Sequence, residues 1–237
     1  FRLTDHIQRL LDSAKLLMMQ VPYSRDELVE CTALLDAVRG ILPKNVNCIY
    51  IRQTEALGLG HAVLCAQHLI GDEPFAVILG DEIIDSPVPA LAQLIHVYKK
   101  RHGAVLGVQE VPKQDVGRYG IVTPQQMSAG LHRVKDLVEK PAPAEAPSNL
   151  AVIGRYVLPP EIFPILRKTA PGKNGEIQLT DAIEALMKEQ QVYAYQFEGT
   201  RYDAGTTMGW LKASVELALA RPELGPELRA YLKELDR

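Results

Sequence analysis

The stretch Phe75-Ala76-Val77-Ile78-Leu79-Gly80-Asp81 decides the fold class of this 237-residue chain. Its first five residues form a short, continuous apolar run, which is typical of a strand buried on both faces of a sheet. A Gly-Asp turn and a proline-containing loop follow, and a helix is predicted over about 90–101. Because strands and helices alternate in this way along the chain, we predict an α/β fold with a mixed, mostly parallel central sheet flanked by helices.

The rest of the chain is divided by the same reading of apolar periodicity, β-branched runs and turn residues. Strands are predicted at 47–52, 75–79, 104–111, 120–123, 134–139, 150–158 and 192–197. Helices are predicted from 3 to about 39 with a break near 21–23, over 27–42 where the periodicity resumes, and at 58–69, 90–101, 160–167, 180–189, 207–220 and 223–235. Thr180 is the expected N-cap of its helix. The chain contains no internal repeat.

Composition narrows the classes of function. Lys and Arg number 26 against 29 Asp and Glu, so the net charge is -3 and no basic run marks a nucleic-acid surface. A polyanionic substrate must therefore be held by a few placed cations and a metal ion. No apolar run reaches the ~18 residues of a membrane span, and no signal-peptide pattern opens the chain, so we expect no membrane partner.

Cysteine usage indicates a reducing compartment. Cys31, Cys48 and Cys65 are odd in number and lack CxxC spacing, which predicts free thiols in the cytoplasm. The chain opens on Phe1 rather than Met, so we expect residues upstream that are removed or not represented.

Two acids follow predicted strands at positions suited to ligand binding. Asp81 comes directly after the strand at 75–79, and Asp203 lies between the strand at 192–197 and the C-terminal helices. Ligands of open α/β sheets bind beyond the carboxyl ends of the strands, and carboxylate oxygens are the ligands that Mg²⁺ prefers. The alternatives are a turn residue for Asp81 and a helix-start residue for Asp203.

The run Val138-Glu139-Lys140-Pro141 ends another predicted strand. Lys140 offers a point charge for a phosphate, and Glu139 can accept hydrogen bonds from sugar hydroxyls. Successive strand side chains point to opposite faces, so both reach one ligand only where the strand ends or bends, as Pro141 would impose. The alternative is a surface salt bridge. With Asp81 and Asp203, this run predicts a site for a divalent cation, a nucleotide and a phosphorylated sugar.

A third motif links Gln53 to the turn Gly58-Leu59-Gly60-His61. A side-chain amide can pair with the edge of a nucleobase, and glycine lets backbone approach a flat base closely. The pattern is neither GxGxxG nor a P-loop. His61 is interpreted as a packing residue at the start of the helix, because no second His or Cys stands at metal-ligand spacing from it.

Taken in order, these motifs and their neighbours resemble the bacterial UTP–glucose-1-phosphate uridylyltransferases, also called UDP-glucose pyrophosphorylases. The resemblance runs from about Ile51 to Leu219. The blocks that carry it are Arg52-Gln53, Gly58-Leu59-Gly60-His61-Ala62-Val63-Leu64-Cys65-Ala66, Gly71-Asp72-Glu73-Pro74-Phe75-Ala76-Val77, Arg118-Tyr119-Gly120-Ile121-Val122, Val138-Glu139-Lys140-Pro141, Pro147-Ser148-Asn149-Leu150-Ala151-Val152-Ile153-Gly154-Arg155-Tyr156 and Gly175-Glu176-Ile177-Gln178-Leu179-Thr180-Asp181-Ala182-Ile183.

The resemblance implies a Rossmann-like nucleotidyltransferase fold and an activity. UMP would pass from UTP to glucose 1-phosphate, giving UDP-glucose and pyrophosphate. It implies these roles: Gln53 and Gly58 at the uracil, Asp81 and Asp203 on Mg²⁺, Gly120 and Glu139 at the glucose, and Lys140 on the sugar phosphate. It also implies a homodimer or homotetramer, for which the C-terminal helices are candidate interfaces.

The sequence departs from this family in three places. Nothing in 1–46 matches the family's first strand, its Gly-rich loop or the lysine-bearing segment after it. We therefore expect a single nucleotidyltransferase domain over 1–237 that is N-terminally incomplete, with C-terminal helices at about 207–237. Gly80 stands where many uridylyltransferases have Pro, and Gly-Asp is usual in thymidylyl- and adenylyltransferases. Ala204 and Thr207 replace the usual Cys and Lys of the Asp203 motif.

Two alternatives to uridylyl transfer remain open at this point. One is a truncated, non-catalytic paralogue that binds a nucleotide-sugar. The other is a thymidylyltransferase or another sugar-1-phosphate nucleotidyltransferase.

Overall fold

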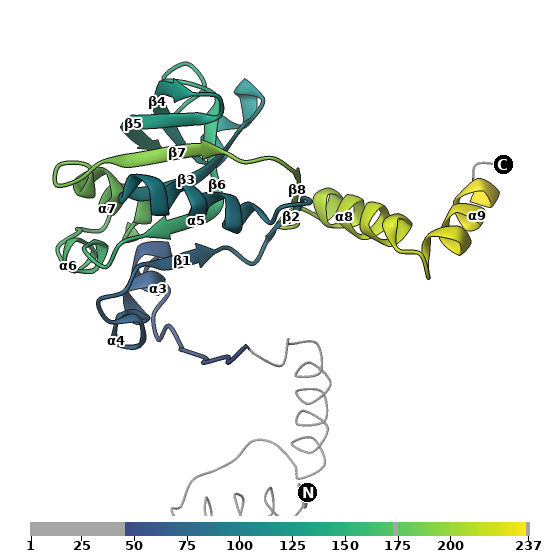
Figure 1. Cartoon of the computed structure of the whole chain (residues 1–237), viewed down its shortest axis with the longest axis horizontal. Coiled ribbons are helices and arrows are strands. Elements are labelled where there is room, and N and C mark those ends of the chain that lie inside the picture. The colour runs from purple at the N-terminus through teal and green to yellow at the C-terminus, as the bar shows by residue number, and fades with distance from the viewer. Residues whose placement is uncertain (1–45, 173–174, 236–237) are drawn as a thin grey trace, which may run out of the picture. The chain divides into compact units, whose positions relative to one another are not determined.

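The computed structural model describes residues 46–172 and 175–235 (Figure 1). The chain divides into two units, Phe1–Tyr50 and Ile51–Arg237. The predicted helices between 3 and 42, and Cys31, lie outside the described residues. Of the first unit, 46–50 are described and have no regular secondary structure.

A six-stranded mixed sheet forms the centre of the second unit, with the strand order β1-β6-β3-β7-β5-β4. These strands are β1 (Phe75–Ile78), β3 (Ala104–Glu110), β4 (Gly120–Ser128), β5 (Leu131–Glu139), β6 (Leu150–Leu158) and β7 (Val192–Gln196). Among the described residues, β3 and β7 are the one parallel pair, and the other neighbours are antiparallel. The α/β class and the mixed sheet are confirmed, but the prediction of mostly parallel strands is wrong, because the described strands pair mostly antiparallel.

The antiparallel pairing has a topological cause. Strands β1 and β3 are both antiparallel to β6, so they run in the same direction, as their strand–helix–strand connection predicts. Strand β6 comes from later in the chain and lies between them. Strands β4 and β5 form a hairpin whose turn contains Gly130 at a φ of 68°.

Two predictions about the strands at 75–79 and 47–52 are also wrong. The strand at 75–79 was expected to be buried on both faces, but burial alternates along β1, which has one sheet neighbour among the described strands. The residues at 47–52 alternate as a strand would, yet no described strand pairs with them, and Tyr50 is 82% exposed. Without a partner their backbone groups have no ladder to join.

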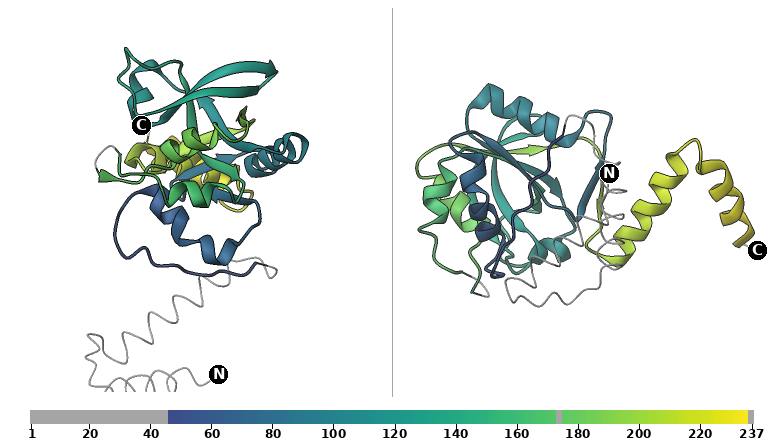
Figure 2. Two further views of the ribbon diagram at one scale, coloured as in Figure 1. Left: turned by 90° about the vertical axis from the view of Figure 1, so that its left-hand side faces the viewer. Right: turned by 90° about the horizontal axis from the view of Figure 1, so that it is seen from below.

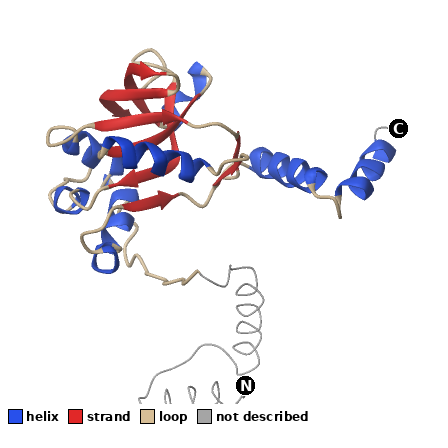
Figure 3. Ribbon diagram, viewed as in Figure 1, coloured by secondary structure: helices blue, strands red, loops and turns tan. Residues whose placement is uncertain are grey.

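Helices cover both faces of the sheet (Figures 2 and 3). The described helices are α3 (Leu59–Cys65), α4 (Gln67–Ile70), α5 (Ala90–Arg101), α6 (Ile162–Leu166), α7 (Leu179–Leu186), α8 (Thr207–Ala220) and α9 (Gly225–Leu235). Helices α3, α6 and α7 cover one face and α5 covers the other, whereas α8 packs on β8 and α9. Strand β6, buried at every position, separates two hydrophobic clusters: Val152 and Leu158 pack with α3, α6 and α7, whereas Ile153 and Val157 pack with α5. Alternate strand residues thus build the two cores. No helix in the described ranges is long and apolar enough to cross a membrane.

A separate two-stranded ribbon positions the predicted acids. Strands β2 (Glu82–Asp85) and β8 (Thr200–Asp203) pair antiparallel, with Glu82 opposite Asp203. The sequence predicted a loop for the first of these segments and no strand for the second. Their pairing brings Asp81, just before β2, to the same end of the ribbon as Asp203, the last residue of β8.

Candidate active site

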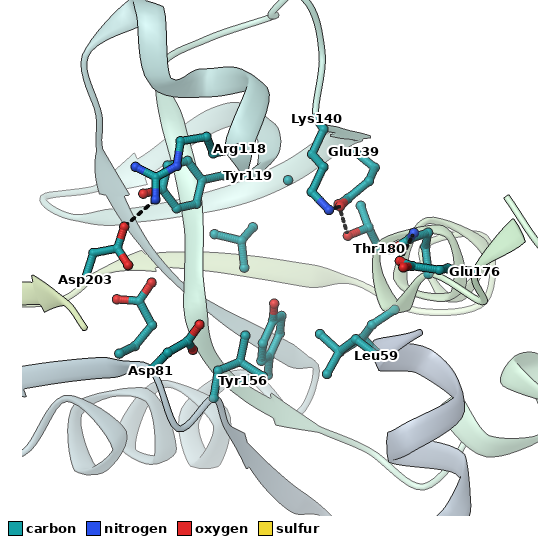
Figure 4. A pocket seen from close by; sticks show the side chains of 16 residues that line it. Leu59, Asp81, Arg118, Tyr119, Glu139, Lys140, Tyr156, Glu176, Thr180 and Asp203 are labelled. Atoms are coloured by element: carbon teal, nitrogen blue, oxygen red, sulfur yellow. Dashed lines mark hydrogen bonds and ion pairs between the residues drawn. The ribbon is translucent and has the colours of Figure 1, made fainter. Parts of the chain in front are cut away.

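A pocket of about 330 Å³ lies where the sheet, the ribbon and helices α3 and α7 meet (Figure 4). Five of the seven predicted site residues line it, although they come from distant parts of the chain. These residues are Asp81, Gly120, Glu139, Lys140 and Asp203. The fold therefore brings the three predicted acids, the glycine and the lysine together around one pocket.

The two aspartates face a common point. The backbone N–H of Ala204 donates to the carbonyl oxygen of Asp81 at 2.8 Å, which joins the two ends of the ribbon. A Cβ atom added to Gly205 would lie 3.1 Å from Asp81 Oδ2 and 3.2 Å from Asp203 Oδ1. Both carboxylates therefore reach the same small volume, which only a glycine at position 205 leaves open.

Arg118 is the cation nearest to this carboxylate pair. It ends the short 3₁₀ helix η1 (Lys113–Arg118), and its Nη2 lies 2.5 Å from Asp203 Oδ2. That hydrogen bond raises the pKa of the guanidinium. The side chain of Arg118 is half exposed. Arg118 belongs to one of the sequence blocks that carry the family resemblance, but no role was predicted for it.

Lys140 reaches the pocket because β5 ends immediately before it. Its backbone φ is 47°, a left-handed conformation that a lysine rarely adopts, and its N–H donates to Tyr119 O at 2.9 Å. The turn brings Lys140 Nζ to 3.2 Å from Glu139 Oε1, so both side chains face one cavity (Figure 4). This local geometry agrees with the prediction that the strand must end at this point.

Thr180 holds the other oxygen of Glu139. Its hydroxyl donates to Glu139 Oε2 at 2.7 Å. The prediction that Thr180 caps its helix is wrong, because α7 begins one residue earlier and Gln178 occupies the N-cap position. A Cβ at Gly120 would lie 3.3 Å from Thr180 Oγ1 and 3.4 Å from Glu139 Oε2. A side chain at position 120 would therefore press against the hydrogen bond between Glu139 and Thr180.

Gln53 and Gly58 lie next to the pocket without lining it. Gln53 Nε2 donates to Gly58 O at 3.1 Å and lies 2.9 Å from His61 Nδ1. Gly58 has a φ of 97°, and a Cβ on it would lie 2.8 Å from the Cβ of Glu176, which does line the pocket. Through Leu59 and Glu176 this turn borders the site, with the side chain of Gln53 turned to its own loop.

A group of buried charges at the wall of the pocket was missed from the sequence; Glu82 lines the pocket, and Arg155 and Arg201 lie behind it. Glu82 lies in a segment that was predicted to be a loop, but it forms an ion pair with Arg201 through two hydrogen bonds, each 2.6 Å long. Arg155 donates to the carbonyl of Leu79 at 3.0 Å and also to the carbonyl of Glu82. Burial lowers the pKa of Arg155 and raises the pKa of the Tyr156 hydroxyl above its ordinary value.

The donor set suits a hard cation held partly by its substrate. Within 46–172 and 175–235, no cluster of three or more His, Cys, Asp or Glu side chains could by itself hold a metal ion. Mg²⁺ is usually bound through one or two carboxylates together with water and substrate phosphates, and Asp81 and Asp203 supply such a pair. The residues fit that ion.

Comparisons with known proteins agree with this geometry. A model of the nucleotidyl transferase family matches residues 7–219. A UTP–glucose-1-phosphate uridylyltransferase of Staphylococcus epidermidis is 51% identical over 190 residues, which cover 80% of this chain and 66% of that protein. The UTP–glucose-1-phosphate uridylyltransferase YngB of Bacillus subtilis is 51% identical over 189 residues, which cover 80% of this chain and 64% of that protein. The chain thus spans slightly less than two thirds of the length of these curated relatives.

Solved structures give the same grouping. A UDP-glucose pyrophosphorylase in complex with UDP-glucose has 44% sequence identity and a TM-score of 0.74, with 79% of this chain and 72% of that chain covered. A UTP-bound enzyme from Acinetobacter baumannii has 38% identity and a TM-score of 0.76, with 88% and 73% covered. The chain therefore belongs to the nucleotidyl transferase family and, within it, to the bacterial UTP–glucose-1-phosphate uridylyltransferases.

Proposed function

We propose that this protein transfers UMP from UTP to glucose 1-phosphate, giving UDP-glucose and pyrophosphate. The observation that carries the proposal is one pocket that joins the pair Asp81 and Asp203 to the pair Glu139 and Lys140. The names of its relatives, and the UDP-glucose and UTP held in two similar structures, support the choice of substrates. No side chain needs to act as a covalent nucleophile.

Each residue has a role in this scheme. Asp81 and Asp203 would hold Mg²⁺, which neutralises charge on the triphosphate. Arg118 forms an ion pair with Asp203 and would place a second positive charge beside the metal ion. Lys140 would bind the sugar phosphate, Glu139 and Gly120 the glucose, and the loop of Gln53 and Gly58 the uracil.

The reaction is a single in-line displacement. An oxygen of the glucose 1-phosphate phosphate group attacks the α-phosphorus of UTP, and a new P–O bond forms. The bond from that phosphorus to the bridging oxygen of the β-phosphate breaks, and pyrophosphate leaves with its electron pair. The residues contribute by positioning the sugar phosphate against the triphosphate of UTP and by offsetting the repulsion between these two anionic groups.

The metal assignment gives a direct prediction. Asp81→Asn and Asp203→Asn each remove one anionic ligand, so Mg²⁺-dependent formation of UDP-glucose should fall below about 1% of wild type. The matched control is Asp85→Asn, at the exposed end of the same ribbon, which should leave the rate unchanged. Retained turnover in either of the first two variants would reject the metal role.

Thymidylyl transfer is the second candidate, and the Gly80-Asp81 pair favours it. A structure of a putative glucose-1-phosphate thymidylyltransferase from Bacillus anthracis is also similar, with 25% identity and a TM-score of 0.63. The two bases differ by one methyl group, which a pocket distinguishes by only about 1–3 kcal/mol. Rates measured with UTP, dTTP, CTP, ATP and GTP decide between them. We expect kcat/KM to be highest with UTP, and a higher value with dTTP would reassign the nucleotide.

Three further parts of the proposal concern the protein as a whole. We infer one nucleotidyltransferase domain, supported by a family match that spans both units of the chain. A cytoplasmic location is supported by free thiols at Cys48 and Cys65.

Self-association as a homodimer or homotetramer is supported by the exposed apolar side chains of α8. Ala213 is the one buried residue of this helix, while Met208, Trp210 and Leu211 are exposed.

A further inference from the structure

We propose that Arg201 is a positioning residue, which holds the metal carboxylates and the phosphate-binding lysine in register through Glu82 and Tyr119. The proposal rests on the function proposed above. Arg201 does not line the pocket, so it acts through the residues that it contacts.

The contacts of Arg201 form a compact, nearly buried cluster. Arg201 Nε donates to Glu82 Oε2 and its Nη2 to Glu82 Oε1, both at 2.6 Å. The same Nη2 lies 3.1 Å from the hydroxyl of Tyr119, and the guanidinium carbon lies 5.1 Å from the centre of the Tyr119 ring. The side chains of Arg201 and Glu82 are 12% and 9% exposed. Burial alone would lower the pKa of Arg201, and its bonds to Glu82 and Tyr119 raise it instead.

Each member of the cluster adjoins a different part of the site. Glu82 directly follows Asp81, and Arg201 stands two residues before Asp203 on the paired strand. Tyr119 precedes Gly120, and its carbonyl accepts the N–H of Lys140 at 2.9 Å. The segments that carry both aspartates and the lysine are therefore joined through one guanidinium, although they are far apart in sequence.

The chemistry of the cluster requires an arginine. A guanidinium can bond both carboxylate oxygens of Glu82 and still lie over an aromatic ring, whereas a lysine ammonium is a point charge without that planar fork. Buried ion pairs often add little net stability compared with apolar side chains of similar volume. Stability alone therefore does not account for this pair. Glu82 lines the pocket and Arg201 lies behind it, which supports a role in alignment.

The test compares three variants with wild type. Arg201→Lys keeps the charge and loses the two-pronged geometry. The double variant E82M/R201M removes both charges and fills the space with apolar side chains. The control Arg221→Lys alters an exposed pair, Arg221 and Glu223, whose charged atoms lie 3.9 Å apart. For each protein we would measure Mn²⁺ affinity by electron paramagnetic resonance, thermal stability, and kcat and KM for both substrates.

We expect Arg201→Lys to lower kcat by about 10- to 100-fold, because a displacement near 1 Å at the reacting groups costs rate of that order. Its Mn²⁺ affinity should fall several-fold, while KM for UTP and glucose 1-phosphate changes much less than kcat. The double variant should melt at least as high as Arg201→Lys and yet stay equally slow. Arg221→Lys should match wild type in every measurement.

Two results would overturn the proposal. One is wild-type kcat and Mn²⁺ affinity in Arg201→Lys. The other is a double variant that regains activity together with stability, because the pair would then be structural only. If wild type makes no UDP-glucose, the proposed function fails, and the Mn²⁺ comparison still decides whether Arg201 aligns the carboxylates.

Discussion

At the scale of single residues, Lys140 illustrates how backbone conformation directs chemistry into the pocket. A lysine with a φ of 47° costs conformational energy, of order 1–3 kcal/mol, which the surrounding structure must offset. Here the bond from its N–H to Tyr119 O and the ion pair with Glu139 hold the conformation. Strained residues of this kind are concentrated at binding sites, which is consistent with a role at the sugar phosphate.

The prediction at this scale is that Lys140→Ala raises the KM for glucose 1-phosphate about tenfold and lowers kcat by about 100-fold, because one phosphate charge loses its partner. Initial rates at varied substrate concentrations measure both. The matched control is Lys135→Ala, an exposed lysine on the same strand β5, which should behave as wild type. Unchanged kinetics in Lys140→Ala would remove the lysine from the mechanism.

Site residues could be predicted from sequence where the signal is local. Asp81 and Lys140 each follow a recognisable strand, and Pro141 marks the end of one of them. The pairing of Glu82 with Arg201 could not be predicted, because the two residues are 119 positions apart and only the β2–β8 ribbon brings them together. Glu82 taken alone has the pattern of an ordinary loop acid.

At the scale of elements, the start of α8 is packed directly against the backbone of Asp203. The N-cap Thr206 accepts a hydrogen bond from the N–H of Gly209 at 3.1 Å, and a Cβ added to Gly209 would lie 1.9 Å from Asp203 O. The helix can approach the ribbon this closely only because position 209 has no side chain. Its first turn therefore fixes where Asp203 stands.

We predict that Gly209→Ala displaces α8 from the ribbon and lowers both stability, by about 1–3 kcal/mol, and UDP-glucose formation. Urea unfolding and steady-state rates measure the two effects. Gly80→Ala serves as the control, since it precedes Asp81 but a Cβ there meets nothing within 4 Å. Equal stability and equal rates in the two variants would show that the close packing has no bearing on the site.

Whether a segment forms a helix or a strand was easier to predict than which strands lie next to one another in the sheet. The bounds predicted for α5, α8 and β6 match the structure; α5 has apolar residues at helical spacing, and β6 is a nearly continuous apolar run. The pairing of β6 between β1 and β3 has no signature in the local sequence, since a strand's pattern records how much of it is buried but not which strands lie beside it. That is why the mostly antiparallel pairing of the described strands was missed.

At the scale of the whole molecule, α8 presents apolar side chains to solvent. Trp210 is 55% exposed, and Met208 and Leu211 are exposed beside it in sequence. Helix α9 contacts α8, and Tyr231 and Leu235 on it are exposed as well. Exposed apolar residues grouped on one pair of helices are typical of a protein interface.

We therefore expect sedimentation to give a dimer or tetramer for wild type and a smaller species for Trp210→Glu, because a charge in an apolar interface is costly. Lys212→Glu, at an exposed position on the same helix, is the control and should keep the wild-type mass. A monomeric wild type, or an unchanged mass in Trp210→Glu, would place the interface elsewhere or exclude one.

Product formation by the purified protein is the most direct test of uridylyl transfer. UTP and glucose 1-phosphate are supplied with Mg²⁺ or with a chelator, and UDP-glucose and pyrophosphate are quantified over time. The proposed function predicts equal amounts of both products with Mg²⁺, and neither with the chelator or in Asp203→Asn. Absence of UDP-glucose with Mg²⁺ present, or its formation at the same rate without a divalent cation, would contradict it.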